Sequence, residues 1–377
     1  MRKIIILYLV TRCMKSGPIQ VLNNIVDNID NNKFDFYLVS VSDEDEKRSI
    51  LTSMKQKFKY YHIPVSKKNA LLGKYSDLVQ FIKILNPDVI HSTGVVPDYI
   101  ISKTFPEKQM IIAHSNVLTD YTMFYGKIWG WILARYHIKI MRKAKEVIAC
   151  SKSLSEIYER KEHLKMKYIR NGLNYVPLKI TDYTNLREEL NLPQNEKIFV
   201  YAASFNKRKN HIFLLKSFVK MNKEGMYHTL ILLGDGPTYD QCYRRFSQYP
   251  FIRFIGRVKH VDQYLIASDY FVSTSKQEGM PMAVLEAMNL GLPYVLSDIQ
   301  QHREIYEIDT TVGKLYQEDN YESFKICIEQ ILKYNKKEEG KKINSIIYNN
   351  FNAKKMSKAY ENVYISMSTR NKKGECL

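Results

Sequence analysis

Residues 273–298 read STSKQEGMPMAVLEAMNLGLPYVLSD. The apolar run Tyr270–Thr274 predicts a buried strand that leads into a polar loop. Pro281 suits the first turn of a helix and Gly291 the position just beyond its end, so we expect this helix to end at Leu290. A second apolar run follows and predicts another strand. Strand, helix and strand in this order are typical of a parallel α/β sheet.

The same alternation of short apolar runs and longer helical patterns extends over the whole chain. It predicts an α/β protein with two doubly wound parallel sheets, one in each half, each covered by helices. The expected strands are residues 3–10, 36–41, 89–92, 110–114 and 147–150 in the first half, and 198–203, 229–234, 252–255, 270–274, 294–297 and 311–315 in the second.

The polar connection 171–197 separates the two halves, and we place the domain boundary near residue 178. The prediction is a Rossmann-like domain over residues 1–178 and a second over 179–352, with a cleft between them at the carboxyl ends of both sheets. Apolar positions at helical spacing in the tail predict a C-terminal helix over about 353–369 that packs back on the first domain.

Composition narrows the class of protein. The chain has 377 residues, of which 45% are hydrophobic and 25% charged, which excludes collagen-like, low-complexity and disordered proteins. Ile4–Val10 is too short to span a bilayer and no cleavage site follows it, so we expect a cytoplasmic protein. The cysteines are scattered without a CxxC pair, which predicts reduced packing residues and no zinc site: Cys13, Cys150, Cys242, Cys327 and Cys376.

The formal net charge of +18 predicts an acidic partner. Residues 121–180 hold 13 Lys or Arg against 4 Asp or Glu, together with both tryptophans. Such a basic aromatic stretch suits the interface of an anionic membrane. A core helix with solvated lysines explains it equally well, because one set of apolar residues falls at helical spacing: Ile128, Ile132, Leu133, Tyr136 and Ile140.

The helix that begins near Pro281 predicts a ligand site. Its amino-terminal amides, from Gly279 to Met282, form a seat for a phosphate or for sugar hydroxyls. Glu278 lies in the preceding loop and Glu286 inside the helix, so two carboxylates can contact two parts of one elongated ligand. That ligand has the shape of a nucleotide sugar. Neither a GxGxxG dinucleotide fingerprint nor a Walker loop is present, which disfavours dehydrogenases and P-loop NTPases.

The Glu278-x7-Glu286 spacing, with Gly279, Pro281 and the Gly291-Leu-Pro that follows, closely resembles family 4 glycosyltransferases, the group 1 glycosyl transferases of the GT-B fold, which include bacterial capsular and exopolysaccharide enzymes. The resemblance covers nearly the whole chain and is weakest between residues 30 and 85. Further landmarks follow in the family's order: Val147–Lys152, Ile169–Asn174, Lys209-Asn210, Leu232–Pro237 and Phe254–Arg257.

The resemblance implies a role for each matching residue. Glu278 and the backbone of Gly279, Met280, Pro281 and Met282 would hold the donor sugar, although Pro281 has no amide to offer, and Glu286 would accept from the ribose hydroxyls. The remaining matches are Lys209 at the donor diphosphate, Arg257 and Val258 at the base, Gly17 at the phosphate, and His114 beside the reacting sugar, with Glu278, His114 and Lys209 as the catalytic set.

Two positions depart from the family. Ser204 stands where the family has an arginine, and Arg208 or Lys207 is the candidate for that second cation. Pro18 follows Gly17 where a second glycine is commoner, which removes one amide. His91, at the end of another expected strand, is as well explained by hydrogen bonding as by function, and Glu304 by helix capping or packing.

The resulting hypothesis is a retaining, metal-independent hexosyl- or N-acetylhexosaminyltransferase without a cofactor. It would move a sugar from a nucleoside-diphosphate sugar, with UDP the default, to a hydroxyl of a lipid-linked or growing surface polysaccharide in capsule or exopolysaccharide biosynthesis. The first domain would bind the acceptor and the second the donor, in the cytoplasm and at the inner face of the cell membrane. No persuasive DxD motif is present, since Asp43-Glu44-Asp45 is expected in a solvated loop.

Three alternatives remain. A GT-B scaffold without activity could support a partner transferase, as Ser204 suggests. The charge alone favours a basic nucleic-acid-binding protein, although no recognisable RNA-binding motif is present and the main hypothesis expects no nucleic acid. An epimerase on the same fold fits the E-x7-E segment less well than a transferase does.

Overall fold

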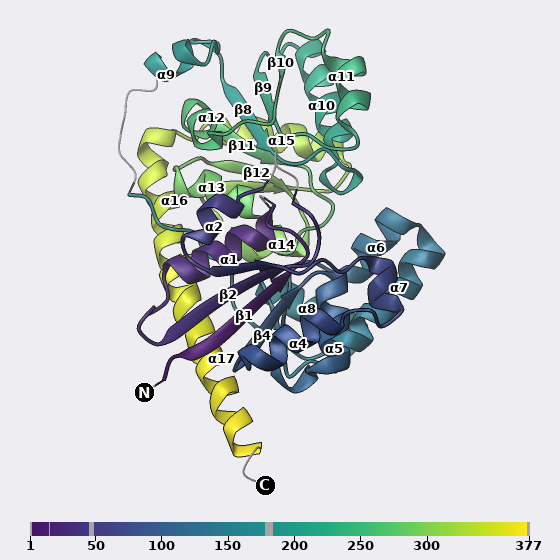
Figure 1. Cartoon of the computed structure of the whole chain (residues 1–377). Coiled ribbons are helices and arrows are strands. Elements are labelled where there is room, and N and C mark those ends of the chain that lie inside the picture. The colour runs from purple at the N-terminus through teal and green to yellow at the C-terminus, as the bar shows by residue number, and fades with distance from the viewer. Residues whose placement is uncertain (1, 15, 45–48, 178–183, 375–377) are drawn as a thin grey trace. The chain divides into compact units, whose positions relative to one another are not determined.

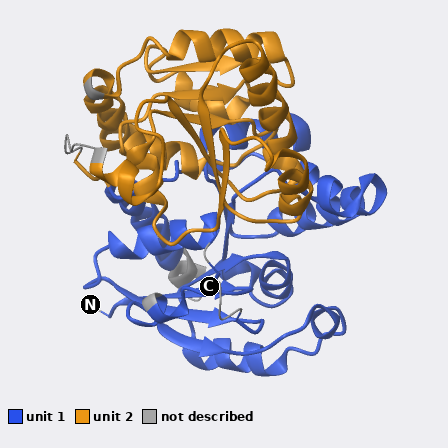
Figure 2. Ribbon diagram, turned by 90° about the horizontal axis from the view of Figure 1, so that it is seen from above, with its two compact units in different colours: residues 1–174, 353–377 blue, residues 175–352 orange. Residues whose placement is uncertain are grey.

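The structure, a computed structural model, describes residues 2–14, 16–44, 49–177 and 184–374. The chain forms two compact units, one of residues 1–174 and 353–377 and the other of residues 175–352 (Figure 2). The boundary predicted at residue 178 itself lies outside the described residues.

Unit 1 is built on a seven-stranded sheet, and every strand pair in it is parallel (Figure 1). The strand order β3-β2-β1-β4-β5-β6-β7 is that of a doubly wound fold, in which the chain starts at the centre and winds outward in both directions. The strands are β1 (Ile4–Val10), β2 (Phe34–Ser40), β3 (Lys59–His62), β4 (Val89–Thr93), β5 (Gln109–Ala113), β6 (Glu146–Ala149) and β7 (Lys167–Tyr168).

Helices connect the strands of unit 1, and the last helix of the chain returns to it. Tyr364 of that helix hydrogen-bonds Tyr8 of β1 between hydroxyls 2.7 Å apart, and both side chains are wholly buried. The helices are α1 (Gly17–Asp27), α2 (Leu51–Lys55), α3 (Lys67–Leu71), α4 (Ser76–Leu85), α5 (Val95–Thr104), η1 (Pro106–Lys108), α6 (Val117–Tyr125), α7 (Lys127–Met141), α8 (Lys152–Glu162) and α17 (Ala353–Gly374).

Unit 2 contains a six-stranded sheet of the order β10-β9-β8-β11-β12-β13, again parallel in every pair. Its central strands are continuous apolar runs because helices cover both faces. The strands are β8 (Ile198–Ala202), β9 (Thr229–Leu233), β10 (Ile252–Gly256), β11 (Tyr270–Ser273), β12 (Tyr294–Ser297) and β13 (Gly313–Tyr316).

The helices of unit 2 include the one predicted to carry the ligand site, α13. Asn344 of α16 donates from Nδ2 to the backbone oxygen of Asn289 at 2.6 Å, which fixes the carboxyl end of α13. The helices are α9 (Thr184–Glu189), η2 (Lys207–Lys209), α10 (His211–Lys223), α11 (Tyr239–Phe246), α12 (Val261–Ala267), α13 (Met282–Asn289), α14 (Gln300–Tyr306), α15 (Tyr321–Ile331) and α16 (Lys336–Asn350).

The structure corrects the sequence analysis in three places. Pro281 is the N-cap of α13 rather than a residue of its first turn, with ψ of 81° outside the helical range. The strands β3 and β7 were not expected. The inward-facing stripe proposed for α7 is wrong, because Ile128, Ile132, Leu133 and Tyr136 are exposed and only Ile140 of that set is buried.

No helix among the described residues is long and apolar enough to cross a membrane. Cys13, Cys150, Cys242 and Cys327 are buried and form no disulfide among the described residues, whereas Cys376 lies outside them.

Candidate active site

Loops at one edge of the unit 2 sheet carry most of the predicted site residues. Because all the strands are parallel, their carboxyl ends meet at the same edge. β8 and β11 are neighbours in the sheet, so the loops that follow them, which contain Lys209 and Glu278, lie next to each other although 69 residues separate the two. The loops after β9 and β10 continue the same edge.

Lys209 and Glu278 form a buried ion pair between Nζ and Oε1. Their side chains are only 14% and 7% exposed. Burial raises the pKa of Glu278, but the positive charges of Lys209 and Arg208 outweigh it and bring the pKa to about 2. Glu278 is therefore ionised at neutral pH and stands ready to accept hydrogen bonds.

Backbone contacts hold Lys209 in place. Asn206 caps η2, with its Oδ1 accepting from the Lys209 amide at 3.2 Å. The carbonyl oxygen of Lys209 accepts from the Tyr201 hydroxyl of β8 and from Thr274 Oγ1 after β11, both at 3.0 Å. Both neighbouring strands therefore fix the loop, which limits how far the ammonium group can move.

The amino end of α13 lies directly after Glu278. Gly279, Met280 and Pro281 are buried and Met282 is half-buried, and no side chain caps the helix, whose first amides point along its axis. Glu286 is half-buried in the second turn. This arrangement suits an anion or a set of hydroxyls at the helix end.

The Gly-Asp-Gly-Pro turn after β9 packs tightly against the loop after β8. A Cβ on Gly234, whose φ is +131°, would lie 2.1 Å from the carbonyl oxygen of Ala203, so only glycine fits. After β10, Nη1 of Arg257 lies 3.9 Å from Oδ2 of Asp235, and both side chains are about two-fifths exposed. Val258 is half-buried. Arg257 and Val258 are thus accessible at the same sheet edge.

His302, on α14 after β12, was not assigned a role from the sequence. Its ring is fully buried, and Nδ1 donates to the carbonyl oxygen of Ser297 at 2.8 Å, while Nε2 has no partner among the described residues. Burial lowers the pKa of His302 to about 4, although the charge of Glu278 opposes the shift. The neutral ring thus presents a bare acceptor nitrogen, which no sequence signal distinguishes from an ordinary packed histidine.

Gly17 and His114 belong to unit 1, at the carboxyl edge of its sheet. Gly17 begins α1, and a Cβ there would meet nothing within 4 Å. His114 follows β5 and is half-buried, and burial lowers its pKa to about 4. His91 of β4 is buried, with its Nδ1 3.3 Å from the Tyr364 hydroxyl and its Nε2 without a partner among the described residues.

The described residues contain no cluster of His, Cys, Asp and Glu suited to a metal ion. Within the Asp43-Glu44-Asp45 segment, Glu44 accepts from the Cys13 amide at 2.9 Å and so stabilises the loop after β1. Asp45 lies outside the described residues.

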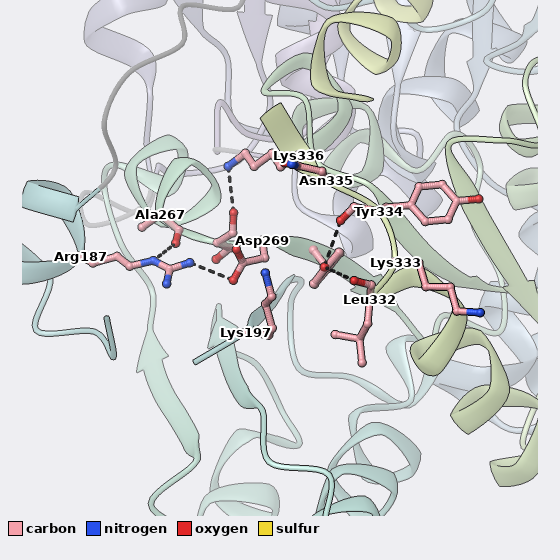
Figure 3. A pocket seen from close by; sticks show the side chains of 11 residues that line it. Arg187, Lys197, Ala267, Asp269, Leu332, Lys333, Tyr334, Asn335 and Lys336 are labelled. Carbon is pink, nitrogen blue, oxygen red and sulfur yellow. Dashed lines mark hydrogen bonds and ion pairs between the residues drawn. The ribbon is translucent and has the colours of Figure 1, made fainter. Parts of the chain in front are cut away.

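A pocket of about 350 Å³ lies at the other edge of the unit 2 sheet, where β11 begins (Figure 3). Arg187 pairs with Asp269 at 2.9 Å, and Lys336 donates to the carbonyl oxygens of Ile266 and Ser268 at 2.7 and 2.8 Å. Lys336 thereby caps the carboxyl end of α12. These contacts account for the buried charges of the pocket as structural.

Comparison with known proteins finds that the chain is similar to sugar-transferring enzymes. Residues 182–351 match the family model "Glycosyl transferases group 1". An O-antigen biosynthesis glycosyltransferase, WclY of Escherichia coli, is 25% identical over 368 residues, covering 95% of this chain and 97% of the relative. N-acetyl-alpha-D-glucosaminyl L-malate synthase of Bacillus anthracis is 25% identical and covers 81% of each chain.

Solved structures agree on the fold. The Anabaena protein Alr3699/HepE, crystallised in complex with UDP and glucose, superposes with a TM-score of 0.77 at 17% identity and covers 96% of this chain and 100% of its own. The architecture of two Rossmann-like parallel sheets is the GT-B fold, as the sequence predicted.

Proposed function

From the match of residues 182–351 to the family model of group 1 glycosyl transferases, we propose that this chain transfers a sugar from a nucleoside-diphosphate sugar to a hydroxyl of a lipid-linked or growing surface polysaccharide. The buried Lys209–Glu278 pair beside the amino end of α13, which no described side chain caps, is the observation that carries the proposal. A fixed cation, a fixed carboxylate and helix amides together match a diphosphate joined to a sugar.

Lys209 stabilises the departing nucleoside diphosphate. Negative charge develops on the leaving oxygen during transfer, and a preorganised ammonium group stabilises it without a metal. Arg208 supplies the second cation that the family places at Ser204, which is supported by its effect on the pKa of Glu278. Lys207 is exposed.

Glu278 accepts from hydroxyls of the donor sugar, and the backbone of Gly279 to Met282 holds the same group. Glu286 accepts from the ribose, and Arg257 and Val258 contact the base. Gly17 and His114 of unit 1 contribute to the phosphate and to the reacting sugar. The configuration at the anomeric carbon is retained, with the leaving phosphate taking the acceptor proton, and no metal or cofactor takes part.

The nucleotide base and the class of acceptor in this proposal are taken from the relatives. HepE was crystallised with UDP-glucose, which supports a UDP-sugar as the donor. WclY is an O-antigen biosynthesis enzyme, which supports a surface polysaccharide as the product. The reaction takes place in the cytoplasm, at the inner face of the cell membrane.

Replacement of Glu286 by alanine is expected to weaken donor binding by about tenfold or more, because two charge-assisted hydrogen bonds to the ribose are lost. The measurement is a thermal-shift and hydrolysis screen against UDP-, GDP- and ADP-sugars. One nucleotide class should stabilise the wild type saturably, and the stabilisation should weaken in the variant.

Glu322→Ala serves as the matched control, since Glu322 of α15 is exposed and pairs only at the surface with Lys220. Its response to the nucleotide should equal that of the wild type. Absence of any response in the wild type would contradict the proposal and favour an inactive scaffold.

A further inference from the structure

The α6–α7 hairpin of unit 1 exposes a cluster of large apolar side chains, which we call the hairpin patch. It consists of residues at the end of α6 and the start of α7: Phe124, Tyr125, Ile128, Trp129, Trp131 and Ile132. Ile128, Trp129 and Trp131 are 74%, 69% and 53% exposed. In Figure 1 the two helices stand at the rim of unit 1, beyond α5 and α8. Contiguous exposed apolar patches mark interaction sites.

Small residues explain why the large ones point outward. A Cβ on Gly130 would lie 2.3 Å from the carbonyl oxygen of Tyr121, so α7 packs on α6 at backbone contact distance. Ala134, one turn later, is fully buried. The first half of α7 therefore packs through glycine and alanine and leaves no room for the tryptophans, whereas its second half buries Ile138, Ile140 and Met141.

The hairpin is also anchored to the rest of unit 1. His137 of α7 contacts Asp98 of α5 through Nε2 at 3.0 Å and the Tyr121 hydroxyl of α6 through Nδ1 at 2.7 Å. His137 and Asp98 are 8% and 2% exposed. Because this buried chain ties three helices together, the hairpin patch is presented on a fixed support.

The charge around the hairpin patch indicates which kind of partner it binds. Residues 121–145 hold six Lys or Arg and no Asp or Glu. Positions 128, 129, 131 and 132 spread over about 160° of the helix surface at 100° per residue, which makes a convex tip rather than one stripe for a protein groove. Tryptophan and tyrosine prefer the headgroup level of bilayers, where flanking lysines meet lipid phosphates.

We propose that the hairpin patch inserts into the headgroup region of an anionic lipid bilayer and docks the enzyme there. This deepens the proposed function, on which it rests for the lipid-linked acceptor. It assigns the docking to one element of the fold, with Trp129 and Trp131 as the inserted side chains and the exposed Lys127, Lys139 and Lys143 as the contacts to lipid phosphate.

The test uses the purified full chain and vesicles of phosphatidylcholine with and without phosphatidylglycerol. Trp129 and Trp131 are the only tryptophans of the protein, so intrinsic fluorescence reports on the hairpin patch without a label. On anionic vesicles the emission should shift to shorter wavelength and be quenched by brominated lipids. Flotation should show the protein with the anionic vesicles.

The triple variant I128S/W129S/W131S should lose about tenfold or more of its vesicle binding. The matched control L71S/L72S/I84S removes three similarly exposed apolar side chains elsewhere in unit 1 and should bind as the wild type does. The variant K127E/K139E/K143E should bind anionic vesicles more weakly than the wild type does. The difference should be largest at low salt, because at high salt screening already weakens the attraction between these lysines and the lipid phosphates.

Three results would overturn the inference. The first two are unchanged tryptophan emission with vesicles and equal vesicle binding by the two apolar triple variants. The third is a dimer of the wild type that the I128S/W129S/W131S variant no longer forms but the control variant does, which would make the hairpin patch an interface between copies. Nucleotide thermal shifts on the same preparations separate the two proposals. Nucleotide binding without vesicle binding rejects the docking alone, and vesicle binding without nucleotide binding rejects the transferase assignment alone.

Discussion

Replacement of Lys209 by methionine is expected to reduce transfer by about 100- to 1,000-fold, the usual effect of removing one preorganised group that stabilises transition-state charge. The same change should also destabilise unit 2. Glu278 is 7% exposed, so it would be left as a buried carboxylate without its cation, which typically costs about 3–5 kcal/mol. Steady-state kinetics and thermal unfolding measure the two effects.

The double variant Lys209→Met/Glu278→Gln separates stability from activity. Removing both charges removes the uncompensated carboxylate, so the double variant should unfold at a higher temperature than Lys209→Met alone yet stay inactive. Lys216→Met, at an exposed position of α10, controls for the loss of a lysine and should change neither quantity. A double variant no more stable than the single one would mean that the ion pair is not buried as described.

Acid should destabilise both units at pH values well above those at which ordinary carboxylates become protonated. Burial lowers the pKa of His91, His211 and His302 to about 3, 3 and 4, against about 6.5 in an unfolded chain. Between pH 6.5 and about 4 the unfolded chain binds protons that the folded chain does not, so stability falls as the pH falls. Each of these histidines should lower the free energy of unfolding by about 2 kcal/mol at pH 5 relative to pH 7.5.

Thermal unfolding between pH 5 and 8 measures this dependence, with His211→Phe as the informative variant. Neither ring nitrogen of His211 has a partner among the described residues, and the ring stacks on Phe205 with centroids 3.9 Å apart. Phenylalanine should keep the stack and remove one of the two wholly buried histidines of unit 2. The pH slope of unit 2 should therefore fall by up to about half, the remainder coming from His302 and from His228, whose pKa burial also lowers. An unchanged slope would show that other groups cause the acid sensitivity.

Much of the fold could be predicted because buried parallel strands are apolar runs. β12 agrees with its prediction residue for residue. β3 and β7 were missed because they lie at the edges of the sheet and contain Lys-Tyr-Tyr-His and Lys-Tyr, which no hydrophobic pattern separates from a loop. The orientation of α7 depended on Gly130, since a contact between helix backbones overrides the apolar period.

The candidate site, like the fold, could be predicted only in part. Local spacing was enough to predict the helix that follows Glu278. The pairing of Lys209 with Glu278 depends on β8 and β11 being neighbours, and the burial of His302 beside them depends on the packing of α14. Neither can be read from residues so far apart in sequence.

Calorimetric titration of the wild type and of Lys209→Met with UDP tests the central claim most directly. We expect one saturable site in the wild type and loss of most of the affinity in the variant, because the ammonium group that meets the diphosphate is gone. Absence of binding by UDP, GDP and ADP, together with salt-sensitive binding of nucleic acid, would contradict the assignment of this site to a nucleotide-sugar donor.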